Sequence, residues 1–189
     1  MEAAPELALH GMVIINTVIP EDALSAGLLG TNRAGHGVVI REDGLILTIG
    51  YLVSDAESVW ITTRSGSTVP GYAVAYDHES GLGLVRATMP LSAAVLDLDD
   101  ALEARIGDRA YIADSGPEGE LHPTRIIARH EFAGRWEYVI DDAIFAAPSH
   151  QSWAGAALLN PQGRVMGIGS LLVQTQHEGE SGTSANMFV

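Results

Sequence analysis

The sequence contains no cysteine and no long hydrophobic run, and these two absences exclude several classes of protein. Without cysteine, its 189 residues can form neither disulfide bonds nor thiolate sites for catalysis or metal binding. No apolar run approaches the roughly 18 to 20 residues that a membrane-spanning helix requires. The first residues, MEAAPE, lack a basic n-region and an apolar h-region, so we expect no signal peptide in this sequence. The missing cysteines leave the compartment open.

Basic residues are also scarce, which bears on the kind of partner. Lys and Arg together number 10, against 24 Asp and Glu, and the formal net charge is −14. A surface of this charge repels phosphate backbones and anionic lipid, so we expect neither a nucleic-acid partner nor a membrane partner. A basic partner and a soluble acidic monomer both fit the charge balance, and the oligomeric state stays open.

What the chain has in abundance is short β-strand patterns. Hydrophobic residues make up 47% and charged residues 18%, enough to bury a core. The predicted strands are apolar runs rich in Val and Ile and separated by Gly, Pro and Asp, a pattern typical of an all-β barrel or sandwich. They are Met12–Val18, Gly37–Arg41, Leu45–Ile49, Val59–Thr63, Leu82–Ala87, Arg109–Ala113, Arg125–His130, Tyr138–Asp141, Ala156–Leu159, Arg164–Ser170 and Asn186–Val189.

Turn and helix signals fall between these runs. Asp43-Gly44 predicts a two-residue hairpin, because primed turns need positive φ, and Gln162-Gly163 is a weaker copy of it. We expect one helical turn within residues 50–57. Residues 20–30 form either a short helix or a loop.

Three segments carry the most specific patterns in the chain. Gly37–Val53 reads GVVIREDGLILTIGYLV, residues 75–86 read AYDHESGLGLVR, and residues 152–169 read SWAGAALLNPQGRVMGIG. They resemble three blocks of the trypsin-like serine proteases of the HtrA (DegP/DegS) kind. The corresponding family patterns are G-S-G-hydrophobic followed by D-G-Y-I-L-T-N-x-H-V-V, then V-G-x-D-x-x-x-D, then G-N-S-G-G-P-L. The resemblance extends from about residue 37 to residue 189.

The resemblance implies an all-β fold of two six-stranded antiparallel β-barrels with a cleft between them. We expect a single trypsin-like domain over residues 1–189. Its N-terminal barrel should occupy about residues 8–88, its linker 89–106 and its C-terminal barrel 107–189, with no PDZ domain in this chain. HtrA relatives often work outside the cytoplasm, so the resemblance is compatible with a periplasmic or secreted location.

The three positions that hold the catalytic triad in this family carry other residues here. Tyr51 occupies the histidine position and Ala154 the serine position. Asp77 matches the first aspartate of its block, and the catalytic aspartate, four residues later, falls on Gly81. In a working triad the serine attacks, the histidine takes its proton and the aspartate orients the histidine, and none of these side chains can do that work.

These substitutions predict a catalytically inactive HtrA-like homologue, a pseudoprotease, that binds an extended peptide or protein or has a regulatory role. We expect no cofactor. The predicted substrate-binding residues are Ser152, Trp153, Ala154 and Ser170, with the first three offering backbone N–H groups as an anion nest. Tyr51 either fills the space between the barrels or donates a hydrogen bond into the cleft.

Two other readings stay open. In the first, the chain is an active serine endopeptidase whose nucleophile has moved to Ser152, with His150 or His36 as its base. In the second, it is a structural or metal-binding scaffold in which His36 and His150 are the metal-ligand candidates. The fold would bring these two histidines to the same cleft, although none of the seven histidines forms a closely spaced ligand pair.

Overall fold

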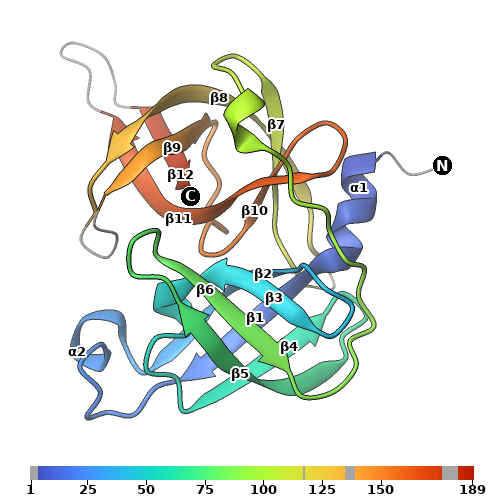
Figure 1. The fold of residues 1–189 in the computed structure, drawn as a ribbon, viewed down its shortest axis with the longest axis vertical. Helices are drawn as coiled ribbons and strands as arrows, with labels where there is room; N and C mark the ends of the chain where they lie inside the picture. The colour runs from blue at the N-terminus through green and yellow to red at the C-terminus, as the bar shows by residue number, and fades with distance from the viewer. Residues whose placement is uncertain (1–3, 117, 135–138, 176–182) are drawn as a thin grey trace.

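The chain folds into two closed antiparallel β-barrels of six strands each (Figure 1), as predicted. A computed structural model describes residues 4–189 except 117, 135–138 and 176–182. The first barrel consists of β1 (Met12–Val18), β2 (Asn32–Val39), β3 (Leu45–Ile49), β4 (Ser58–Thr63), β5 (Thr68–Tyr76) and β6 (Leu82–Ala87). The second consists of β7 (Arg109–Ala113), β8 (Leu121–Phe132), β9 (Ile140–Ala147), β10 (Ala157–Leu159), β11 (Val165–Thr175) and β12 (Thr183–Phe188).

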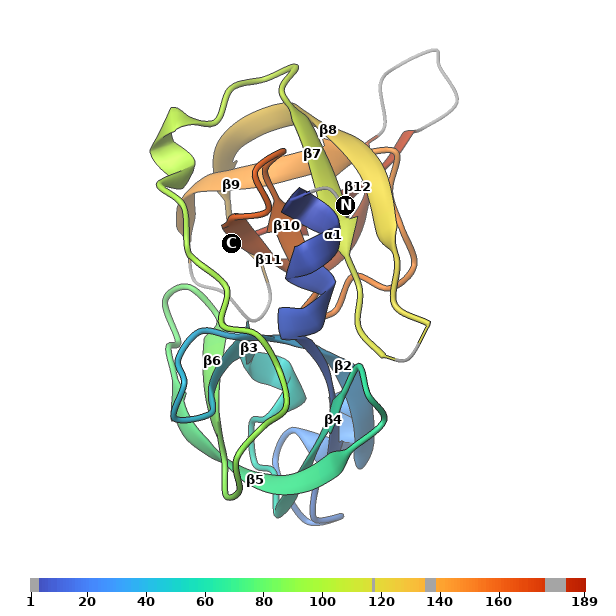
Figure 2. The ribbon, with the colours of Figure 1, turned by 90° about the vertical axis from the view of Figure 1, so that its right-hand side faces the viewer.

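Both barrels close in the same strand order. Around the first barrel the strands follow one another as β1-β2-β3-β6-β5-β4. The second barrel closes in the equivalent order, β10-β11-β12-β9-β8-β7. Two perpendicular views show the barrels stacked one on the other and joined by a single extended crossing (Figures 1 and 2). In the described parts of the chain, helical structure is confined to α1 (Ala4–Ala8), η1 (Leu9–Gly11), α2 (Ala26–Leu29), η2 (Gly50–Leu52) and η3 (Ala101–Glu103). None of the described helices is long and apolar enough to cross a membrane.

Strand positions agree with the sequence patterns where apolar residues dominate. The bounds of β1, β3, β6 and β7 are those predicted. The sequence did not indicate β5, whose residues are mostly exposed or half-buried and include the pair Pro70-Gly71. Similarly, β2 begins at Asn32, well before the predicted start, because its polar residues pair with β1 as far as Val18. Both segments therefore become strands because they pair with a neighbouring strand, and their local sequence pattern does not indicate it.

Both predicted two-residue hairpin turns are wrong in type. Between β2 and β3, the Gly44 N–H donates to the Arg41 carbonyl at 3.1 Å, and Ile40 pairs with Leu45 around a wider loop. Gly163 makes the same contact to the Asn160 carbonyl at 2.9 Å. Only the glycine in each turn has positive φ, 78° for Gly44 and 80° for Gly163. One left-handed residue suffices for these longer turns, whereas the predicted type I′ turn needs two.

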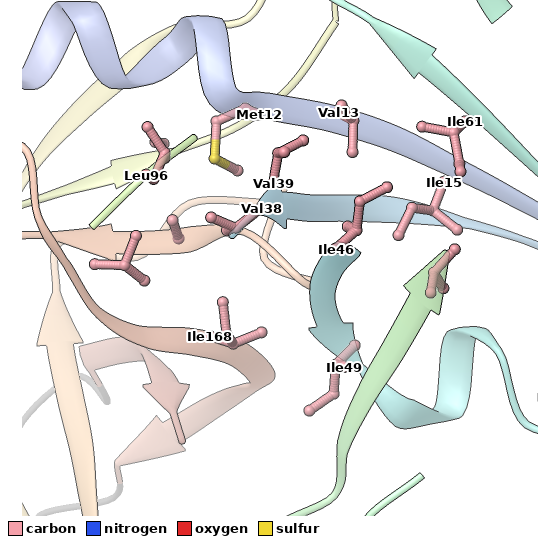
Figure 3. Close-up of a cluster of buried hydrophobic side chains, with 14 of the residues drawn as sticks. Met12, Val13, Ile15, Val38, Val39, Ile46, Ile49, Ile61, Leu96 and Ile168 are labelled. Atoms are coloured by element: carbon pink, nitrogen blue, oxygen red, sulfur yellow. The ribbon is translucent and has the colours of Figure 1, made fainter. Parts of the chain in front are cut away.

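A hydrophobic cluster joins the two barrels (Figure 3). Met12, Val38 and Ile46 of the first barrel belong to the same cluster as Leu159 and Ile168 of the second. Burying each of these side chains stabilises the fold by about 1.5 to 3 kcal/mol. Because this shared cluster lies beside β3, β10 and β11, it fixes how the loops at the barrel junction face one another.

Candidate functional site

Tyr51 reaches from one barrel to the other. It lies in η2, directly after β3, and its hydroxyl donates a hydrogen bond to the Ser170 carbonyl of β11 at 3.1 Å. Its ring faces that of Trp153, with centroids 6.3 Å apart and planes tilted by 59°. The side chain therefore occupies space between the barrels and also donates a hydrogen bond there.

A buried arginine holds the backbone that carries Tyr51. Arg33 of β2 donates to the Tyr51 carbonyl at 2.6 Å and to the Ser54 carbonyl at 3.1 Å. Its remaining nitrogens donate to the Gly30 carbonyl and to the Ser25 hydroxyl. Burial lowers the pKa of the Arg33 guanidinium, and nearby Asp55 opposes that shift. Several directed hydrogen bonds thus fix the turn that presents Tyr51.

Gly81 contributes only backbone to the junction. Its carbonyl accepts the N–H of Gly50, the residue before Tyr51, at 2.6 Å, and its φ is 76°. Asp77 shapes the preceding turn, since its carboxylate accepts the Ser80 hydroxyl at 2.5 Å. That bond and two backbone N–H groups lower the pKa of Asp77. The Asp77 carboxylate therefore stabilises the turn over residues 77–80.

The loop that carries Ala154 is hydrogen-bonded to β2 on one side and to β11 on the other. The Ala154 carbonyl accepts the His36 N–H at 2.8 Å, and the Gly155 N–H donates to the Gly169 carbonyl at 2.8 Å. Gly155 has a φ of 77°, and a Cβ there would lie 2.1 Å from the His36 carbonyl oxygen. Together with the Tyr51–Trp153 and Gly50–Gly81 contacts, this arrangement brings Tyr51, Gly81 and Ala154 to the same junction.

Ser152 contacts His150 through its backbone. The Ser152 N–H donates to His150 Nδ1 at 3.2 Å. Within the part of the chain that the structure describes, the Ser152 hydroxyl has no hydrogen-bond partner, so it lacks the contact to a base that activates a serine nucleophile. The same bond uses the N–H that Ser152 would offer to the predicted anion nest.

His36 pairs with Ser115 rather than with His150. Its Nδ1 accepts the Ser115 N–H at 3.1 Å and lies 2.7 Å from the Ser115 hydroxyl oxygen. Burial lowers the pKa of His36; Asp114 opposes this shift and His150 adds to it. Because Nδ1 accepts hydrogen bonds, the neutral ring carries its proton on Nε2. His36 therefore links β2 of the first barrel to the turn after β7 of the second.

His150 instead stacks on His122, a residue that the sequence did not single out. The two ring centroids are 3.4 Å apart and the planes differ by 13°. His122 Nε2 in turn lies 3.1 Å from Asp114 Oδ2. Burial and then His122 lower the pKa of His150, while Asp114 and Glu120 oppose the shift. The β8–β9 pairing, with Arg125 opposite Ala147, leads the chain toward His122, whereas the β7–β8 pairing brings His122 to Asp114.

Residues 35–168 match the family described as the trypsin-like peptidase domain. Among individual proteins, the chain is 26% identical over 151 residues to serine protease HTRA1B of Danio rerio, covering 74% of this chain and 30% of that protein. It is also 26% identical over 152 residues to serine endoprotease DegS of Haemophilus influenzae, covering 77% of this chain and 43% of that one. The chain thus spans less than half the length of these relatives.

Solved structures give the same fold. The HtrA-type protease AlgW with tripeptide superposes with a TM-score of 0.77 at 18% sequence identity, covering 98% of this chain and 58% of the other. AlgW with decapeptide superposes with a TM-score of 0.76 at 16% identity, covering 99% and 62%. At these identities the likeness establishes the two-barrel architecture alone.

Proposed function

Because this chain belongs to the trypsin-like peptidase domain family yet carries Tyr51, Gly81 and Ala154 where a triad would be, we propose that it is a catalytically inactive member that binds extended peptides. The observation that carries this proposal is the contact of Tyr51 with Ser170 and Trp153. A phenol that bridges the barrels takes the place where an imidazole would have to meet a serine hydroxyl. Ala154 has no hydroxyl to activate.

An open strand edge supports the peptide-binding role. Beyond Gly169, β11 pairs with β12 through Thr175 on one side, while β10 reaches only Ile168 on the other. Among the described residues, no strand pairs with this second edge over residues 171–175. An extended peptide can add to such an edge through main-chain hydrogen bonds. The HtrA-type protease AlgW, which shares this fold, has been solved with a tripeptide and with a decapeptide.

The relocated-nucleophile alternative finds less support. His150 Nδ1 is directed at the Ser152 N–H, and the ring stacks on His122. A base for Ser152 would need a hydrogen bond to the hydroxyl and a third group to orient it. His36, the other base candidate, directs its Nδ1 at Ser115. Both imidazoles are therefore engaged away from the Ser152 hydroxyl.

Inactivity is tested by covalent labelling. We expect wild-type protein and the Ser152→Ala variant to give equally no adduct with a fluorophosphonate probe and no cleavage of casein, because neither His150 nor His36 directs its Nδ1 at the Ser152 hydroxyl. An active trypsin-like protease, labelled in parallel, shows that the reagent works. Peptide mapping of an adduct on Ser152, lost together with casein cleavage in Ser152→Ala, would overturn the proposal and make the chain an enzyme.

Peptide binding is tested with fluorescent hexapeptides of basic, neutral and acidic composition, measured by anisotropy. We expect the basic peptides to bind most tightly, in a salt-sensitive way, because the net charge is −14. In Tyr51→Phe, the hydroxyl no longer competes with the peptide for the Ser170 carbonyl. Since a hydrogen bond contributes about 0.5 to 1.5 kcal/mol, the affinity should rise by about 2- to 12-fold.

The matched control for peptide binding changes the peptide and leaves the protein unchanged. The same peptides with N-methylated backbones keep their side chains but lose the N–H donors that strand addition needs. They should bind much more weakly to both wild type and Tyr51→Phe. Equal binding of methylated and unmethylated peptides would contradict the strand-addition mode, and no binding of any peptide would contradict the proposed role.

A further inference from the structure

We propose that Asp114, His122 and His150 form a binding site for a divalent transition metal ion of the Zn²⁺ type. Each residue offers one ligand atom, and these atoms all lie within 4.8 Å of one another. Within this set, His122 Nε2 and Asp114 Oδ2 lie 3.1 Å apart. This site is separate from the proposed peptide-binding role and does not depend on it.

The ligand types select the class of metal. Two imidazoles and one carboxylate make a three-ligand set that Zn²⁺ takes in proteins, with further positions left for water or another ligand. Fe²⁺, Co²⁺ and Ni²⁺ also accept such mixed nitrogen and oxygen sets. Mg²⁺ and Ca²⁺ prefer sites built from oxygen alone. The cluster therefore favours a borderline transition metal over the hard alkaline-earth ions.

Hydrogen bonds outside the cluster hold its members in place. Asp114 Oδ1 accepts the Glu120 N–H at 2.7 Å, which leaves Oδ2 directed at His122. On the other side, the fully buried Asn186 of β12 accepts the His150 N–H at 2.6 Å and donates to the His150 carbonyl at 3.1 Å. Such outer partners orient metal ligands, and their loss typically lowers metal affinity by about 10- to 100-fold.

Metal binding requires a small movement of the two rings. The lone pair of an imidazole nitrogen lies in the ring plane, and the two planes here are within 13° of parallel. The rings must turn until two lone pairs converge on the ion, while the backbone of His150 stays fixed by Asn186. Turning the His150 ring also changes its hydrogen bond with the Ser152 N–H, so the amide resonance of Ser152 should shift on metal binding.

Isothermal titration of untagged protein, stripped with EDTA and dialysed, tests the site. We expect ZnCl₂ to give the heat of one site and MgCl₂ to give none. His122→Gln and His150→Gln should each weaken Zn²⁺ binding by at least about 100-fold, the upper end of what losing an outer partner costs. The matched control is His78→Gln, which removes a histidine that contacts Tyr76 at a tilted angle outside the cluster and should leave the affinity unchanged.

Two results would overturn the site. One is the absence of Zn²⁺ heat in the wild type, and the other is wild-type affinity in the folded double variant of His122→Gln and His150→Gln. A readout that needs no variant is the visible spectrum of Co²⁺ added to the wild-type protein. We expect the intense d–d bands of a four- or five-coordinate ion, and a spectrum identical to that of aqueous Co²⁺ would also overturn the proposal.

Discussion

Replacing Gly155 by Ala should lower the free energy of unfolding by about 2 to 5 kcal/mol. The left-handed φ of 77° costs an L-residue about 1 to 2 kcal/mol. The added Cβ would also lie 2.1 Å from the His36 carbonyl oxygen and 2.8 Å from Thr48 Oγ1, and overpacking of this kind costs about 1 to 3 kcal/mol more. Urea unfolding, followed by far-UV circular dichroism, measures the change.

Gly66→Ala separates the two causes. Gly66 has a similar φ of 83°, but nothing lies within 4 Å of a Cβ built on it. This variant should therefore lose only the backbone part, about 1 to 2 kcal/mol. Equal losses in both variants would show that the loop of Ala154 can move away from β2. The close approach of Gly155 to His36 would then not be what positions the junction.

Replacing Arg33 by Met should lower the free energy of unfolding by about 2 to 6 kcal/mol, because the carbonyls of Tyr51 and Ser54 lose their charged donor. Methionine keeps most of the apolar stem and removes the guanidinium. The carbonyls of Tyr51 and Ser54 then lose the donor that holds them at 2.6 and 3.1 Å. Each acceptor left unsatisfied in a buried site costs about 1 to 3 kcal/mol.

Arg41→Met is the matched control for Arg33. Arg41 pairs with Asp43 at 2.8 Å on the surface, where its side chain is 61% exposed. Removing an exposed pair of this kind changes stability by about 0 to 1 kcal/mol. The near-UV circular dichroism of Arg33→Met should also change, because the Tyr51–Trp153 contact depends on the turn that Arg33 holds. Similar losses in the two variants would contradict the anchoring role.

Together these contacts describe a junction that is held mainly by backbone hydrogen bonds. Gly81 and Gly155 contribute main-chain hydrogen bonds there, and Tyr51 joins the barrels through Ser170. The proposed metal site adjoins this junction, since His150 contacts the Ser152 N–H. A metal ion and a peptide could therefore influence each other through one loop, while each can be tested alone.

The two-barrel architecture could be predicted without the structure. Strands such as β1 and β3 bury apolar side chains on a barrel wall, so their composition and spacing predicted their bounds. The order of the three blocks predicted the two barrels. The residues at positions Tyr51, Gly81 and Ala154 could be read directly, because the chemical identity of a side chain does not depend on the fold. β5, mostly exposed and lacking an apolar pattern, gave no such signal.

Which polar groups meet depends on how the chain packs in three dimensions. Tyr51 and Ser170 are 119 positions apart, and His36 and Ser115 are 79 apart, so no local pattern could pair them. The predicted partnership of His36 and His150 rested on both lying near the cleft. The β8–β9 and β7–β8 pairings brought His150 to His122 and Asp114, because strand pairing sets neighbours by geometry across the sheet and not by distance along the chain.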